Sequence, residues 1–199
     1  MNIRQYKQVL KSGMDEIASY QNRDKLLINT GYDMFDMLVP GSVVTIAGPS
    51  FTGKTILLNK LKKNIMSVDY NSHANNFIWL SNSLEMTILM NTLRDLSFKL
   101  GKPKKEILLT HFEEHEKLLV KQYYVEQSDG RFFINEEPPT PEEFREEVGK
   151  FLEEYKDKDL VVVDFDHTAL AKGKNKKEVM DAIYQIQNEF KKTYPNVLF

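Results

Sequence analysis

The sequence predicts an α/β fold built around a largely parallel sheet. Short apolar or β-branched runs alternate with amphipathic helical segments, which is the pattern of parallel strands joined by crossover helices. The run Leu160–Val163 (LVVV) is apolar at every position, as expected for a strand buried on both faces. A glycine-containing loop that ends in Gly-Lys-Thr joins the first such run to the helix that follows. These three observations favour a layered α/β domain.

The composition narrows the class of protein. Of 199 residues, 41% are apolar and 28% charged, as in an ordinary globular domain, and the formal net charge is −2. So small a charge excludes a global attraction to nucleic acid, so DNA binding would require a local patch. The absence of cysteine excludes disulfides and cysteine-ligated metals. Without a long apolar run or signal peptide, we expect a cytoplasmic protein with no membrane partner.

The N-terminal part predicts one helix, then a strand and a helix. Apolar residues at helical spacing predict a helix over Ile3–Tyr20, within an N-terminal unit of residues 1–27. This helix either packs on its own domain or is a linker that docks on a neighbouring subunit. The run Ser42–Ala47 (SVVTIA) predicts a buried strand, and Ile56–Met66 predicts a helix.

The middle of the chain continues the alternation of strands and helices. Phe77–Leu80 (FIWL) predicts a second buried strand, and Met86–Leu100 a second amphipathic helix. A single further helix is expected over Glu106–Tyr124, followed by a short strand at Arg131–Ile134 (RFFI).

A helix start is marked near residue 140. Thr140 is a suitable N-cap, Pro141 suits the first helical position, and Glu143 completes a capping box. We expect this helix to run to about Tyr155. The remaining predicted elements are the buried strand Leu160–Val163, a helix over Lys177–Lys192 and the opening of a strand at Val197–Phe199.

The strongest chemical signal is a phosphate-binding loop. Gly48–Thr55 (GPSFTGKT) fits the pattern G-x-x-x-x-G-K-[ST], and it lies between a predicted strand and a predicted helix, as its mechanism requires. In such loops backbone N–H groups surround the phosphates; Lys54 would reach the β- and γ-phosphates, and the Thr55 hydroxyl would hold Mg²⁺. We therefore expect ATP and Mg²⁺ as cofactors, bound by Gly48, Pro49, Ser50, Phe51, Thr52, Gly53, Lys54 and Thr55.

Carboxylates are expected beside this loop. Asp164 follows the buried run Leu160–Val163, so it lies at the carboxyl end of a strand, where it would hold the metal together with Thr55. Asp166 is the alternative. Glu85 follows the strand Phe77–Leu80 and is a candidate for orienting the attacking water. From its position alone, it could equally be a first-turn glutamate that the helix dipole favours.

Residues Ile28–Phe199 resemble the ATPase domain of DnaB-like hexameric replicative DNA helicases, a RecA-like P-loop NTPase fold. The matching features are Thr30-Gly31 with Asp36, the P-loop, Ser83-Leu84-Glu85-Met86 and the strand that ends in Asp164. The S-L-E-M sequence is the most discriminating, although Asn82 precedes it where an aromatic residue is common. The resemblance implies that Glu85 is the catalytic base, acting with Lys54 and Asp164.

The resemblance also implies partners and a boundary. It implies an ATP-driven motor on single-stranded DNA in a homo-oligomeric, hexameric ring, with a primase or helicase loader as further candidate partners. The family's sensor, DNA-binding loops and arginine finger would follow Phe199, so we expect residues 28–199 to form an ATPase domain that is incomplete at its C-terminus. The strand at Val197–Phe199 should lie between the strands that lead to the P-loop and to Asp164.

Two other interpretations stay open. The chain could be a RecA-like ATPase switch, or a recombination or loading factor that binds ATP without unwinding DNA. It could also be a non-enzymatic loader or inhibitor. For DNA contact the candidates are Lys172, Lys174, Lys176 and Lys177, which could equally form a solvated basic loop.

Overall fold

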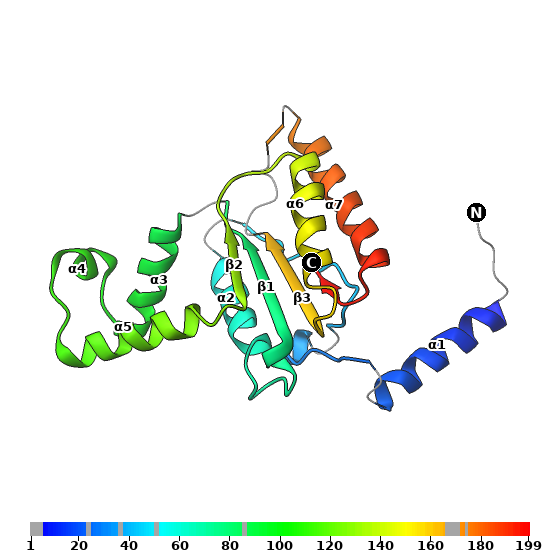
Figure 1. Ribbon diagram of the computed structural model, residues 1–199, viewed down its shortest axis with the longest axis horizontal. Coiled ribbons are helices and arrows are strands. Elements are labelled where there is room, and N and C mark those ends of the chain that lie inside the picture. The colour runs from blue at the N-terminus through cyan, green and yellow to red at the C-terminus, as the bar shows by residue number, and fades with distance from the viewer. Residues whose placement is uncertain are drawn as a thin grey trace.

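The computed structural model describes residues 6–22, 25–35, 38–49, 52–84, 87–165, 172–173 and 175–199, and only the backbone of residues 6–9. Its centre is a four-stranded sheet in the order β2-β1-β3-β4, in which every pair of neighbours is parallel (Figure 1). The α/β fold class predicted from the sequence is therefore confirmed. The strands are β1 (Phe77–Asn82), β2 (Phe132–Asn135), β3 (Leu160–Phe165) and β4 (Val197–Leu198).

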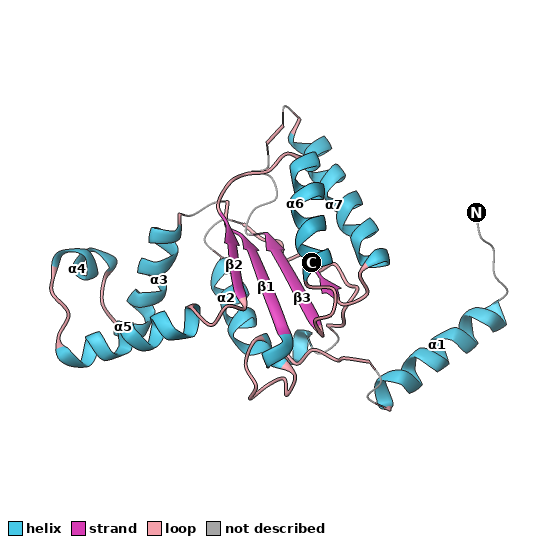
Figure 2. Cartoon of the chain, viewed as in Figure 1, coloured by secondary structure: helices cyan, strands magenta, loops and turns pink. Residues whose placement is uncertain are grey.

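Helices cover both faces of the sheet (Figure 2). Helix α2 (Lys54–Ile65) packs on one face, while α6 (Pro141–Glu154) and α7 (Lys176–Thr193) pack on the other. The side chains of β3 alternate between the two cores: Leu160 and Val162 belong to the α2 side, and Val161 and Val163 to the α6–α7 side. A strand buried on both faces needs apolar residues at every position, which explains its sequence.

Strand β4 and the residue after it connect two parts of the structure: strand β3, and the segment that precedes the P-loop. On one edge it pairs with β3, with Val161 opposite Val197. On the other edge Phe199 donates its N–H to Ser42 O at 3.0 Å, and Val44 donates its N–H to Phe199 O at 2.7 Å. Residues 197–199 were predicted to lie between the segment that leads to the P-loop and the strand that carries Asp164, and this position is confirmed.

The predicted buried strand Ser42–Ala47 is wrong in its extent. Only Ser42 forms a β-bridge, with Leu198, and Thr45 and Ala47 are exposed. The backbone hydrogen bonds that join this segment to residues 197–199 extend from Gly41 to Val44. The side chains of this segment still alternate between the two faces of the sheet. Val43 packs against the α6–α7 core, and Val44 and Ile46 pack against the α2 core.

A separate helical unit extends beyond β2 (Figure 1). The single helix predicted over Glu106–Tyr124 is instead two helices, because Glu113 starts a new one: its N–H donates to Glu116 Oε2 at 2.9 Å in a capping box. Leu93, Leu96 and Ile107 form the small core of this unit. Its helices are α3 (Ile88–Leu100), α4 (Lys104–Leu109) and α5 (Glu114–Gln127).

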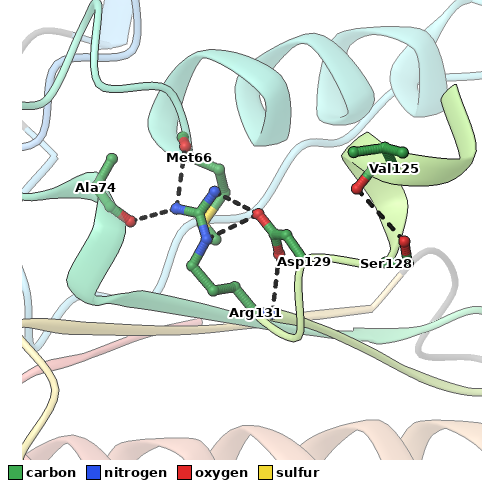
Figure 3. Close-up of polar contacts among 6 residues, drawn as sticks. All are labelled: Met66, Ala74, Val125, Ser128, Asp129 and Arg131. Carbon is green, nitrogen blue, oxygen red and sulfur yellow. Dashed lines mark hydrogen bonds and ion pairs between the residues drawn. The ribbon is translucent and has the colours of Figure 1, made fainter. Parts of the chain in front are cut away.

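Arg131 fixes the point where this unit returns to the sheet (Figure 3). Its guanidinium donates to the carbonyl oxygens of Ala74 and Met66, at 2.5 and 3.4 Å, and forms an ion pair with Asp129 at 2.5 Å. Met66 and Ala74 belong to the connection between α2 and β1. The start of β2 is therefore tied to that connection as well as to β1.

The remaining helices follow the predictions. Helix α6 begins with the expected capping box, in which Glu143 N–H donates to Thr140 Oγ1 at 3.1 Å and Thr140 N–H to Glu143 Oε2 at 2.7 Å. Short 3₁₀ turns lie at Asp33–Phe35 and Ala74–Asn76. In the described part of the chain, no helix is both long and apolar enough to span a bilayer.

The N-terminal helix α1 (Tyr6–Gln21) projects away from the sheet (Figure 1). Its apolar side chains Leu10, Met14 and Ile17 are 49%, 62% and 51% exposed. These residues share one helical face, since their spacings are four and three. Of the two interpretations of this helix, packing on its own domain receives no support from these exposures.

Candidate nucleotide-binding site

The P-loop enters α2 through Gly53. This residue has φ of 87°, in the left-handed region where glycine alone is free of strain, and it occupies the N-cap position. A glycine offers no side chain to cap the helix, and α2 has no side-chain cap. Among the described residues no side chain caps the first-turn N–H groups of α2, and N–H groups at such a helix start favour an anion.

The lysine of the loop lies against the loop's own backbone. Lys54 Nζ donates to Gly48 O at 2.9 Å and to Pro49 O at 2.8 Å. Thr52 Oγ1 also donates to Pro49 O, at 2.8 Å, and a Cβ added at Gly48 would lie 3.1 Å from that hydroxyl. The backbone therefore passes close around the lysine. Ser50 and Phe51, also predicted to bind nucleotide, lie outside the described residues.

Asp164 is held at the carboxyl end of β3. Its Oδ2 accepts hydrogen bonds from Ser81 Oγ, at 2.7 Å, and from Trp79 Nε1. Ser81 is its partner in the β1–β3 register, and Asn82 Nδ2 donates to the Asp164 carbonyl at 3.0 Å. Cross-strand pairing thus fixes both the backbone and the carboxylate of Asp164.

Two neighbouring cavities bring the predicted residues together. Lys54, Thr55 and Asp164 line a cavity of about 130 Å³ between α2 and the sheet, whose other walls are mainly apolar. Thr55 and Asp164 also line a second cavity, of about 420 Å³, which extends towards α3 and α5. Residues more than one hundred positions apart therefore meet at one site.

The second cavity contains polar side chains that sequence reasoning missed. Asn59 Nδ2 donates to Asp95 Oδ1 at 3.5 Å, and Tyr123 OH donates to Asp95 Oδ2 at 3.4 Å. Burial raises the pKa of Asp95. Burial also lowers the pKa of Lys62, while the negative charge of Asp164 acts to raise it. Asn59 and Lys62 follow Thr55 by four and seven residues, so helical spacing could have placed them on its face.

The segment that precedes Glu85 is well anchored. Ser83 is buried; its N–H donates to Asn135 O at 2.8 Å, and its hydroxyl accepts from Asn91 Nδ2 at 2.8 Å. The end of β1 is therefore bonded to both β2 and α3. Glu85 and the alternative metal ligand Asp166 lie outside the described residues.

Thr30 and Gly31, which belong to the motif Thr30-Gly31 with Asp36, lie near the other end of α2. Asn64 Nδ2 donates to Thr30 O at 2.8 Å, and a Cβ on Gly31 would come within 2.6 Å of the Tyr70 ring. Thr30 and Gly31 thus pack the chain against the C-terminal end of α2, away from the P-loop. Asp36 lies outside the described residues.

The lysine-rich segment is only partly a loop. Lys176 and Lys177 form the first turn of α7, which Asn175 caps by accepting from Lys177 N–H at 3.1 Å. Lys172 donates its backbone N–H to Pro139 O at 2.9 Å, and its side chain is exposed. Lys174 lies outside the described residues.

The oxygen donors at the site suit magnesium bound to a nucleotide. Magnesium prefers oxygen ligands, and commonly takes one or two carboxylates and lets phosphates and water complete its shell. Thr55 and Asp164 supply a hydroxyl and a carboxylate to the same cavities. Among the described residues, no three His, Cys, Asp or Glu side chains group into a metal site made by protein alone.

A parallel sheet with a P-loop helix on one face, and β4 between the two site-bearing segments, defines a RecA-like P-loop ATPase fold. The chain is similar to a DnaB-like replicative helicase solved to show its interactions with primase, with a TM-score of 0.75, 16% identity and coverage of 99% of this chain and 48% of that one. It is also similar to the ATPase domain of G40P, with a TM-score of 0.71, 16% identity and coverage of 99% and 70%.

These similarities show the fold, and the predicted RecA-like architecture is confirmed. The chain spans about half the length of the first helicase chain, 48% of it. No protein-family model matches the sequence, and no curated protein matches it.

Proposed function

We propose that this chain is the ATP-binding and hydrolysing motor domain of a replicative DNA helicase, which couples hydrolysis to translocation on single-stranded DNA. One observation carries the proposal: the P-loop residues Lys54 and Thr55 share a cavity with Asp164. They do so in a fold that aligns, over 99% of the chain, with a replicative helicase. The helicase resemblance of Ile28–Phe199 in sequence points the same way.

Each side chain has a role in this proposal. Lys54 binds the β- and γ-phosphates, and the α2 N-terminus and loop amides surround them. Thr55 and Asp164 hold Mg²⁺, which neutralises phosphate charge when bound. Glu85 orients the attacking water and accepts its proton. The proposed units are residues 1–27, which contain α1, and the ATPase domain of residues 28–199.

The proposed partners follow from surfaces and from the comparisons. The exposed apolar face of α1 supports a homo-oligomer, for which a hexameric ring is proposed. Single-stranded DNA is the proposed track, with exposed Lys172 and Lys177 as candidate phosphate contacts. The structure of one similar helicase was solved to show its interactions with primase, so a primase or a helicase loader is a candidate partner of this chain.

Nucleotide binding tests the proposal directly. Mg-ATP at 100 times its dissociation constant should stabilise the folded chain by about 2.7 kcal/mol, measured as a rise in melting temperature. Lys54→Ala should abolish this rise. Lys60→Ala is the matched control, because Lys60 is an exposed lysine of the same helix. A parent protein whose melting temperature ignores millimolar Mg-ATP would refute the proposal.

Turnover separates the motor from the alternatives. We expect single-stranded DNA to stimulate ATP hydrolysis by an oligomer of the whole protein that contains this domain, and any strand separation by that oligomer to require hydrolysis. ATP-dependent assembly without unwinding would instead identify a switch or a loading factor.

A further inference from the structure

Three polar groups converge beside the P-loop in an arrangement that no sequence motif indicates. The indole N–H of Trp79 and the hydroxyl of Ser81 both donate to Oδ2 of Asp164. The indole N–H also donates to Ser81 Oγ at 3.2 Å, so each of the three groups contacts the other two. Trp79 and Ser81 alternate by two along β1, which places both on the face that Asp164 shares through the β1–β3 register.

Trp79 has a polar function as well as a place in the core. It is 1% exposed, and its indole N–H can only donate, so it needs an acceptor inside the protein. Asp164 Oδ2 and Ser81 Oγ are its acceptors, and Lys62 Nζ lies 5.9 Å from the centre of the indole ring. The ring is thus fixed by α2 above it and by the carboxylate beside it.

We propose that Trp79 and Ser81 are positioning residues that fix the Asp164 carboxylate for a divalent cation bound with the nucleotide. The inference rests on the proposed function and adds two residues to its site. Two donors on one oxygen prevent the carboxylate from rotating, and hydrogen bonds to an ionised acceptor are strong. Among the described residues, Asp164 is the one carboxylate that lines both cavities with Thr55, so its orientation matters most.

Magnesium titration of matched variants tests the proposal. Trp79→Phe keeps an aromatic ring but loses the N–H, Ser81→Ala loses the hydroxyl, and Ser81→Thr keeps it. Binding of a fluorescent ATP analogue is measured against Mg²⁺ concentration and again in EDTA. We expect the first two variants to need about 10- to 100-fold more Mg²⁺ for half-maximal binding, as for other partners of metal ligands. Their binding in EDTA should equal that of the parent, and Ser81→Thr should behave as the parent does.

A second measurement needs no nucleotide. Trp79 is the single tryptophan of the chain, so its emission reports on its acceptor. Asp164→Asn replaces an ionised acceptor by an amide and should shift that emission, whereas Asp157→Asn, at an exposed position, should not.

The outcomes separate the two proposals. If the parent binds Mg-ATP, and folded Trp79→Phe and Ser81→Ala share its Mg²⁺ midpoint, the positioning role is refuted. An Asp164→Asn emission spectrum identical to that of the parent refutes it as well. If the parent fails to bind Mg-ATP, the proposed function itself fails.

Discussion

At the scale of single residues, the proposed function gives the side chains around Thr55 different roles. In the proposed function Lys54 binds phosphate, Thr55 and Asp164 hold the cation, and Glu85 acts on water. If these roles are right, binding and hydrolysis depend on different side chains, and we expect a variant to lose one without the other.

Glu85 offers the clearest such separation. Glu85→Gln keeps the size of the side chain but removes its ability to accept a proton. We expect turnover to fall by roughly 10²- to 10⁴-fold, while Mg-ATP still raises the melting temperature. Steady-state ATPase assays of the oligomer measure this, with exposed Glu147→Gln as the control. Equal turnover in Glu85→Gln and the parent would refute the proposed catalytic role of Glu85.

The stability of the protein at alkaline pH tests the environment of Tyr123, whose hydroxyl donates to Asp95. Burial, together with the Asp95 carboxylate, raises the pKa of Tyr123 from 10.0 to about 12. Because the folded pKa exceeds the unfolded one, this residue contributes stability that is fully present below pH 10 and is lost as the pH rises towards 12. Tyr123→Phe should therefore lose less stability than the parent over this range.

Urea unfolding at pH 9, 10 and 11 measures the difference. Tyr124→Phe is a matched control, because Tyr124 is the next residue of α5 and is 71% exposed. It should follow the parent. Parallel pH profiles for the parent and Tyr123→Phe would contradict the raised pKa of this half-buried phenol.

At the scale of elements, helix α6 is fixed by its first turn. The capping box of Thr140 and Glu143 satisfies two backbone N–H groups that the helix itself leaves unbonded. Thr140→Ala should therefore reduce the free energy of unfolding by about 1 kcal/mol in urea titrations. Thr140→Ser, which keeps the hydroxyl, should stay close to the parent, and an equal loss in both variants would exclude the cap as the cause.

The same local chemistry explains which elements the sequence predicts well. The α6 cap and the apolar run of β3 are local signals, and the structure has both where the sequence places them. The sequence pattern does not reveal the break before α5, because Glu113 and Glu116 suit the interior of a helix as well as the capping box that they form at its start. The strand at Ser42–Ala47 was overestimated because its sequence does not reveal how few residues pair with it.

At the scale of the whole molecule, the site is a product of strand order. The loop at 48–55 and the acid at 164 meet because residues 197–199 bond to the segment 41–44 on one side, and β4 pairs with β3 on the other. Motifs brought together Thr55 and Asp164, the two residues proposed to hold the metal, since each lies within a local pattern. The bonds from Trp79 and Ser81 to Asp164 depend on strand register, which local sequence does not specify.

The exposed face of α1 makes a prediction about assembly. Full burial of a Leu, Ile or Met side chain contributes about 1.5–3 kcal/mol, and these three side chains, about half exposed, would each gain roughly half of that when a partner covers them. We expect that partner to be a second copy of the chain. We expect the parent to sediment as an oligomer, and the triple variant Leu10→Gln, Met14→Gln, Ile17→Gln to sediment as a monomer at the same concentration. Glutamine preserves helix propensity, so circular dichroism should stay nearly constant.

A matched triple variant tests whether the effect belongs to α1. Leu108, Leu109 and Leu118 of α4 and α5 are 59%, 72% and 58% exposed, comparable with the α1 residues. Replacing these three by glutamine removes a similar exposed apolar area from a different surface, and the oligomer should survive. If this control dissociates the oligomer as fully as the α1 variant does, association depends on general surface hydrophobicity. If the parent is monomeric at every concentration, α1 is not the contact that assembles the proposed ring.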